Sequence, residues 1–236
     1  MRTKTLLLAG AALALSLATS QAQVYSANIV GYANVPMVTG YNMVANQFSN
    51  GANTADVVLT SLPDGTFMET WNGTGYTISI YDTGSGSTTP ALSWYMSDYS
   101  TPTNPPTLNP GLGFFLLLPS PTTNTFVGSV VPNINGFTTN HLVVNYNLVG
   151  STVPLAAQVV DPSVNLLPPD GTFMETWNGN GYTTSIYDTG SGSTTPALSW
   201  YMSDYSTSTN PPTLKVGQGF FLLLPSSYAW TQTLTP

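Results

Sequence analysis

A block of 55 residues occurs twice in this chain, 106 positions apart. Residues 64–118 and 170–224 differ at only six positions. The differing pairs are Thr74/Asn180, Ile78/Thr184, Pro102/Ser208, Asn109/Lys215, Pro110/Val216 and Leu112/Gln218. Upstream, GYNMVAN from Gly40 resembles NYNLVGS from Asn145. A repeating unit of about 100 residues has the size of a small domain, so the duplication predicts two copies of one fold in tandem rather than a solenoid.

The first residues have the layout of a secretory signal peptide. A basic start, MRTK, precedes the apolar stretch TLLLAGAALALSLA and the small residues of TSQAQ. The apolar stretch is shorter than a membrane span requires. We therefore expect cleavage after Ala22, with Ser20 and Ala22 as the small residues of the site, and export to the periplasm, the cell surface or the medium. An uncleaved anchor is the alternative.

After cleavage the chain is acidic and almost free of basic residues. Ten Asp and Glu residues then stand against Lys215 alone, a net charge of −9. A surface without a basic patch binds nucleic acid and anionic lipid poorly, so neither is expected as a partner. Only 6% of the residues are charged, so Ser, Thr, Asn and Gln must provide solubility. The absence of cysteine excludes disulfides, thiol catalysis and cysteine-ligated metals.

Short alternating runs predict β-structure. The segments FMETW and YTISIY, joined by NGTG, have the pattern of a β-hairpin. In that hairpin Phe67 and Trp71 share a face, and Tyr76, Ile78 and Ile80 lie opposite them. The run GFFLLLP is continuously apolar over the length of a strand, which is typical of a strand buried on both faces. Gly, Pro, Ser, Thr and Asn are too frequent for helices beyond the signal peptide.

These patterns predict an all-β fold. We expect two tandem, near-identical β-sandwich-like domains after the signal peptide. The expected divisions are residues 1–22 for the signal peptide, 23–132 for the first domain with its N-terminal strand, and 133–236 for the second domain.

The tetrad Asp-Thr-Gly-Ser, at Asp82 and again at Asp188, is the active-site motif of pepsin-like aspartic proteases. Those enzymes need two carboxylates side by side, sharing one proton. Here a long polar stretch, GSGSTTP, follows each Asp, and no apolar-apolar-Gly element matches the one behind the protease loop. Because the whole 55-residue block is duplicated, the second tetrad adds little weight. We expect a surface loop, with the protease as the third and least favoured function.

Other catalytic and metal-binding patterns are weaker. His141 is the only histidine and lies in the expected linker, so a Ser-His-Asp triad would exist at most once in a duplicated chain. Glu69 and Glu175 are expected in mid-strand and facing solvent. Asp82 and Asp98 offer the oxygen ligands that Ca²⁺ prefers, but the spacing of a calcium loop is missing. We therefore expect no enzyme activity, no catalytic residue, no metal site and no cofactor.

Aromatic residues provide the better candidate for a binding site. Exported β-sandwiches often stack apolar sugar faces on aromatic rings, while Asp and Asn accept from the hydroxyls. Core packing explains such rings equally well. The candidate residues, which recur in both copies, are Trp71, Trp94, Tyr95, Asp98 and Tyr99, and Trp177, Trp200, Tyr201, Asp204 and Tyr205.

The chain also resembles a known group of proteins. A signal peptide is followed by VYSANIVGY, GYNMVANQ, WNGTGY and LNPGLGFFLLLP, and the last motif recurs as KVGQGFFLLLP. This pattern resembles exported, largely uncharacterised verrucomicrobial-type proteins in which a WNG hairpin and a GxGFF strand recur in tandem. The resemblance implies export and a β-domain, and it transfers no activity or catalytic residue.

Three short segments resemble one another near the ends of the copies. FVGSVVP closes the first copy, WTQTLTP closes the second, and IVGYANVP stands near the mature N-terminus. If each copy has its own closing strand, residues 24–36 are left over and can add to the sheet of a neighbouring molecule. The alternative is that they pair within the first copy.

The function expected from the sequence is that of an exported, non-enzymatic β-repeat protein. It would serve as a structural component of the cell surface, a matrix or an adhesive layer, with a second copy of itself or surface glycans as partners. A glycan-binding module is the second hypothesis.

Overall fold

The computed structural model describes residues 29–84, 93–131, 136–190 and 199–234, so the expected signal peptide lies outside the described residues. Within them the chain is all β, as the sequence predicts, apart from one short helix, α2 (Ala55–Val58). This helix corrects the expectation that no helix follows the signal peptide. None of the described helical segments has the length and apolar character needed to cross a membrane.

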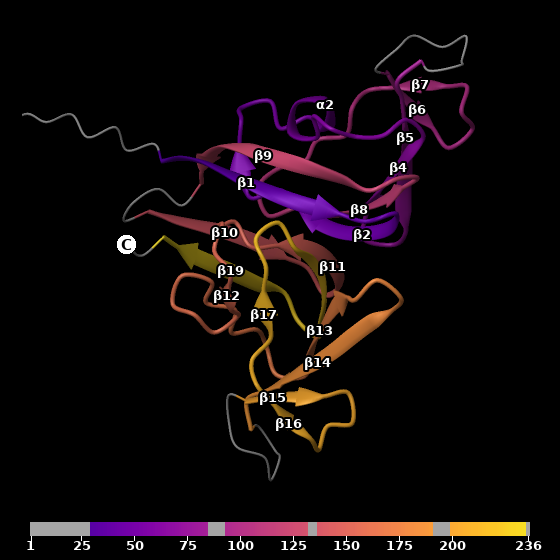
Figure 1. Cartoon of the computed structure of the whole chain (residues 1–236). Helices are drawn as coiled ribbons and strands as arrows, with labels where there is room; N and C mark the ends of the chain where they lie inside the picture. The colour runs from indigo at the N-terminus through magenta and orange to yellow at the C-terminus, as the bar shows by residue number, and fades with distance from the viewer. Residues whose placement is uncertain (1–28, 85–92, 132–135, 191–198, 235–236) are drawn as a thin grey trace, which may run out of the picture.

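The first half of the chain forms two sheets (Figure 1). Strands β2, β8, β4, β5, β6 and β7 form a six-stranded sheet in that order, and β1, β9 and β3 form a smaller one. Their bounds are β1 (Val30–Met37), β2 (Gly40–Ala45), β3 (Phe48–Ser49), β4 (Thr66–Trp71), β5 (Tyr76–Asp82), β6 (Ser93–Met96), β7 (Pro102–Thr103), β8 (Gly113–Leu118) and β9 (Thr122–Val130).

The second half repeats the large sheet. Strands β11, β18, β13, β14, β15 and β16 follow in the equivalent order, while β10 pairs with β19 and β12 with β17. Their bounds are β10 (Phe137–Leu142), β11 (Asn145–Gly150), β12 (Ala157–Gln158), β13 (Thr172–Trp177), β14 (Tyr182–Asp188), β15 (Ser199–Met202), β16 (Ser208–Thr209), β17 (Thr213–Leu214), β18 (Gly219–Leu224) and β19 (Tyr228–Thr233). The expected boundary at residue 132 lies outside the described residues, so the division into domains stays a prediction.

Each half packs its two sheets around a hydrophobic core. In the first half, Phe114 and Leu116 of β8 meet Phe126 of β9, and all three are buried. In the second half, Phe220 and Leu222 of β18 occupy the equivalent places opposite the closing strand β19. The described parts of the two halves differ here, since α2 and β3 occur in the first half alone. The β12–β17 pair of the second half corresponds in the first half to a single bridge between Thr54 and Thr107.

The GFFLLL strands are buried on both faces, as the sequence predicts. In β8, Phe114 and Leu116 face the core of the first half, while Phe115 on the opposite face joins a third cluster. That cluster contains Met43 and Phe115 from the first half, Leu148 and Phe221 from the second, and the rings of Trp71, Tyr146 and Trp177. On this second face, the inner strands of each large sheet are therefore covered by the other half of the chain.

The contacts between the halves come in equivalent pairs. The Trp71 indole Nε1 donates to the carbonyl of Tyr146 at 2.9 Å, and Trp177 Nε1 donates to the carbonyl of Tyr41 at 3.0 Å. Backbone bonds repeat the pattern, since Ala45 N donates to Gly217 O and Gly150 N donates to Gly111 O. Such reciprocal contacts are those of a two-fold interface between identical surfaces. The two halves thus pack as a pseudo-dimer within one chain.

The N-terminal strand is used within its own half. β1 pairs with β9 along its whole length, from Val30 opposite Ser129 to Met37 opposite Thr122, and β10 pairs with β19 in the same manner. Each half therefore has one strand that leads into its large sheet and one that closes it. For the described part of residues 24–36, the spare strand is wrong, and the alternative of pairing within the first half is correct. β1, β9 and β19 contain most of the described residues of the three similar segments, and β10 is the counterpart of β1 in the second half.

The predicted hairpin is confirmed in both halves. Phe67 lies opposite Ile80, and Trp71 lies opposite Tyr76, as the alternation requires. At the turn, the Asn72 side chain accepts from the backbone N–H of Gly75 at 2.9 Å, and Gly73 has φ +100°. This backbone region is one that glycine enters at no steric cost.

Gly73→Val is therefore expected to destabilise the protein by more than about 1 kcal/mol. A β-branched residue has no relaxed conformation at this φ, although no atom lies within 4 Å of a Cβ built there. Gly75→Val is the matched control, since that site is equally open and its φ is not positive. Urea denaturation of both variants checks the result, and equal midpoints for the two would contradict the turn.

Candidate functional site

The described residues of the two Asp-Thr-Gly-Ser tetrads, 82–84 and 188–190, lie at opposite ends of the molecule. Asp82 ends β5 opposite Ser93 of β6, and Asp188 ends β14 opposite Ser199 of β15. Figure 1 shows β6 at the top of the molecule and β15 at the bottom. Two carboxylates so far apart cannot share a proton, which the aspartic-protease mechanism requires. Within one chain, the two tetrads therefore do not form the paired active site of a pepsin-like protease.

Local hydrogen bonds explain the residues of the tetrad. The carboxylate of Asp82 accepts from Gly84 N at 2.6 Å. Asp64, at the start of the same hairpin, accepts from Thr83 N at 2.7 Å and from its hydroxyl at 2.8 Å. Asp188 and Asp170 make the same bonds in the second half. The described part of each tetrad is thus a loop held in place by hydrogen bonds to carboxylates.

Four of the ten aromatic-site candidates are buried. Trp94, Tyr95, Trp200 and Tyr201 have at most 3% of their surface exposed. Trp94 and Trp200 belong to the cores of their halves. The hypothesis that these four rings stack on sugars is wrong, because a ring enclosed by protein presents no face to a ligand.

Trp71 and Trp177 hold the two halves together. The ring centroid of Trp71 lies 5.8 Å from that of Phe221, and the centroid of Trp177 lies 6.1 Å from that of Phe115. Both pairs meet nearly edge to face, the arrangement that aromatic quadrupoles favour. Together with the indole hydrogen bonds, these contacts assign both tryptophans to the interface between the halves rather than to a ligand.

The four remaining candidates lie in two equivalent turns. Asp98 and Tyr99 are in the turn between β6 and β7, and Asp204 and Tyr205 are in the turn between β15 and β16. Asp98 accepts from Ser100 N at 3.0 Å, from Thr101 N at 2.9 Å and from the Thr101 hydroxyl at 2.6 Å. Tyr99 is 57% exposed, with φ +57°, and its ring centroid lies 5.7 Å from that of Phe67. Asp204 and Tyr205 repeat this arrangement, which is the candidate functional site of each half.

The bonds to Asp98 predict its titration. The Thr101 hydroxyl, then the backbone N–H groups of Thr101 and Ser100, lower the pKa of Asp98 from 3.8 to about 2. The stabilisation that the carboxylate gives the turn is therefore fully present above pH 4 and is lost as the pH falls through about 2. NMR titration of the Asp98 carboxyl carbon checks this. A midpoint near 4 would mean that the turn bonds do not hold the carboxylate.

Several buried polar atoms on β6 and β15 have no hydrogen-bond partner. Among the described residues, Trp94 Nε1, Tyr95 Oη, Trp200 Nε1 and Tyr201 Oη are buried and make no hydrogen bond, at equivalent places in both halves. Most buried polar groups in proteins are paired, so a repeated exception needs an explanation.

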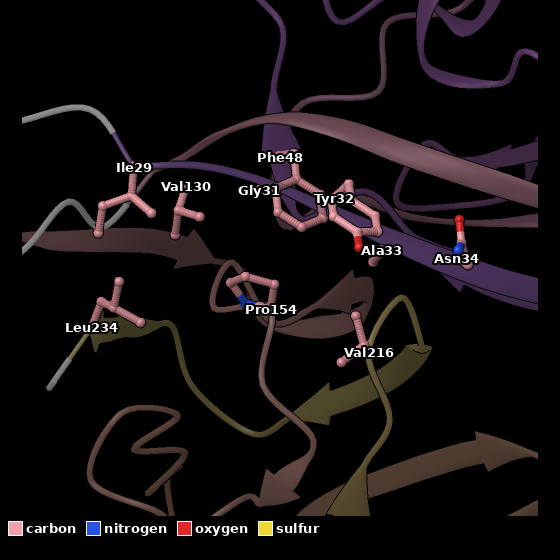
Figure 2. A pocket seen from close by; sticks show the side chains of 10 residues that line it. All are labelled: Ile29, Gly31, Tyr32, Ala33, Asn34, Phe48, Val130, Pro154, Val216 and Leu234. Atoms are coloured by element: carbon pink, nitrogen blue, oxygen red, sulfur yellow. The ribbon is translucent and has the colours of Figure 1, made fainter.

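A separate cavity of about 500 Å³ lies between the halves (Figure 2). β1 runs along one side, with Tyr32 and Ala33, and Pro154, Val216 and Leu234 of the second half lie across from it. The lining is mostly apolar, and no titratable side chain other than Tyr32 contributes to it. The cavity thus offers apolar contacts but no acid or base.

The other residues weighed from the sequence are scattered. His141 lies in β10, opposite Ala229 and exposed, rather than in a linker. Glu69 is half-buried and accepts from the Tyr41 hydroxyl at 3.2 Å, while burial raises the pKa of Glu175. These glutamates are therefore not the fully solvated side chains that were expected. The described residues contain no group of three or more His, Asp or Glu placed to hold a metal ion.

Sequence reasoning missed one contributor to each candidate site. Phe67 supports the exposed Tyr99, and Phe173 supports the exposed Tyr205. The alternation in FMETW had already placed Phe67 on one face of its hairpin. What that face meets depends on the next strands of the sheet, which the alternation does not specify.

Comparison of the chain with family models, with curated proteins and with solved structures gives no match.

Proposed function

We propose that this chain is an exported, non-enzymatic structural protein of the cell surface, a matrix or an adhesive layer, and that it acts as a connector with two equivalent ends. The observation that carries the proposal is the pair of terminal hairpins, residues 93–103 and 199–209. Their sequences differ only at Pro102 and Ser208, and they lie at opposite ends of the molecule (Figure 1).

The body between the two hairpins supports this function. Each hairpin forms the outer edge of a six-stranded sheet, and the two sheets meet through the aromatic cluster and the reciprocal backbone bonds described above. A protein with two like binding surfaces at a fixed separation links two partners, or two points on one partner, and gains affinity from doing so.

The partner is a surface glycan or a second copy of the chain. The exposed tyrosines favour the glycan, so a glycan-binding module remains the second candidate.

The test follows the full-length chain in the producing cells with a C-terminal tag. We expect a mature protein that begins at Gln23 and is digested when protease is added to intact cells, or is recovered from the matrix or medium. Replacing both Tyr99 and Tyr205 with Asn is expected to release the protein from surface or matrix into the medium. A protein that is protected inside intact cells, or whose retention is unchanged by the double replacement, would refute the proposal.

A further inference from the structure

We propose that each terminal hairpin binds a neutral saccharide, with Tyr99 and Tyr205 as the rings on which the sugar stacks. This inference rests on the proposed function and names the partner of the two ends. Its starting point is the backbone. Tyr99 and Tyr205 have φ +57° and +58°, in a region that bulky side chains rarely adopt. Strain of this kind persists where the surrounding structure enforces it, and such residues concentrate at ligand sites.

The surrounding bonds fix the ring in an exposed position. Asp98 holds both residues that follow Tyr99 through their backbone N–H groups, so the turn cannot relax without losing these bonds. The Tyr99 ring meets Phe67 at an interplanar angle of 83°, and yet 57% of the residue stays exposed. The second half reproduces the contact between Tyr205 and Phe173 at 5.8 Å and 82°. An aromatic ring is thus presented to solvent with little freedom to move.

A second observation comes from the strand beneath. Phe67 lies opposite Ile80, and Ile80 lies opposite Tyr95, so Tyr95 is on the face of the sheet that supports Tyr99. The Tyr95 side chain has 2% of its surface exposed, and Tyr201 is its equivalent in the second half with 3%. Tyr95 therefore supports the site from within the protein and presents no group to a ligand.

Charge selects the ligand class. Among the described residues Lys215 is the only Lys or Arg, and it lies in the second half beside Gly217, away from the β6–β7 turn. An anionic glycan would find no cation at either hairpin, while the Asp98 carboxylate would repel it. A neutral sugar carries no charge for Asp98 to repel, and its apolar C–H face suits the exposed tyrosine ring.

Binding is tested with the mature protein and defined polysaccharides. The probes are cellulose, chitin, laminarin, xylan and starch, with alginate as the anionic control. We expect retention on at least one neutral polymer and none on alginate. Calorimetry with an oligosaccharide of the retained polymer should give two sites per chain. If no neutral polymer is retained, or if alginate is retained equally, the saccharide inference is overturned.

Matched variants locate the sites. Tyr99→Asn and Tyr205→Asn remove the rings and keep a residue that tolerates positive φ, so the turns should remain. Each single variant should bind one oligosaccharide, and the double variant should lose binding at least tenfold. Tyr95→Phe combined with Tyr201→Phe should leave binding unchanged, because both hydroxyls are buried. Tyr32→Asn, at a tyrosine that is 73% exposed on β1, is the control and should bind like the wild type.

The outcomes separate this inference from the proposed function. If the double Asn variant binds saccharide as well as the wild type, the hairpin sites are refuted. If no sugar binds, and sedimentation shows that the wild type self-associates while the double variant does not, the partner is a second copy of the chain. The saccharide inference then fails, whereas the two-ended connector stands. Unchanged surface retention of the double variant would instead remove the connector itself.

Discussion

Trp230→Ala is expected to lower the free energy of unfolding by about 3–5 kcal/mol, the range for removing a large aromatic side chain from a core. Trp230 is fully buried in β19, where its ring lies 5.9 Å from that of Phe220. Its indole Nε1 also donates to the carbonyl of Val164 at 2.7 Å, which would lose this partner. Urea denaturation of the mature protein measures the change.

The first half supplies the control for this prediction. Phe126 holds the equivalent place in the closing strand β9 and is also buried. Trp230→Phe therefore keeps most of the ring and gives up the hydrogen bond, and we expect it to cost well under half as much as Trp230→Ala. If the alanine variant unfolds within 1 kcal/mol of the wild type, β19 does not close the second core.

Gly219→Val is expected to destabilise the protein by about 3 kcal/mol and to disturb the contact between the halves. A Cβ at Gly219 would lie 2.6 Å from the carbonyl oxygen of Val44 and 3.1 Å from its carbonyl carbon. Backbone atoms cannot rotate away as a side chain does, so the strands of the two halves must separate. In the equivalent place, a Cβ at Gly113 would lie 2.9 Å from Val149 N and O, so Gly113→Val should have the same effect.

Two measurements check this result. Urea denaturation gives the loss of stability, and small-angle scattering shows whether the molecule becomes larger as the halves move apart. Gly181→Val is the control, because no atom lies within 4 Å of a Cβ at that site and its φ is not positive. A Gly219→Val protein with the stability and radius of the control would mean that the halves do not touch at this point.

Local rules in the sequence determined the strands of this protein. Alternation placed Phe67 opposite Ile80 and Trp71 opposite Tyr76, and Gly73 takes the positive φ expected in its turn. The continuous apolar run GFFLLL predicted a strand covered on both faces, which β8 and β18 are. These features depend on side-chain periodicity and backbone sterics within a few residues, so they can be predicted from the local sequence.

Only the tertiary structure decided which aromatic rings are free. Trp94, Tyr95 and Tyr99 stand within six residues, yet the first two are buried and the third is exposed. Likewise, the sequence left open whether residues 24–36 form a spare strand or pair within the first copy, and the structure pairs β1 with β9. Burial on the second face of a sheet, and the choice of a strand's partner, depend on residues distant in the sequence. The energy that decides them comes from packing between the halves, which alternation and composition do not encode.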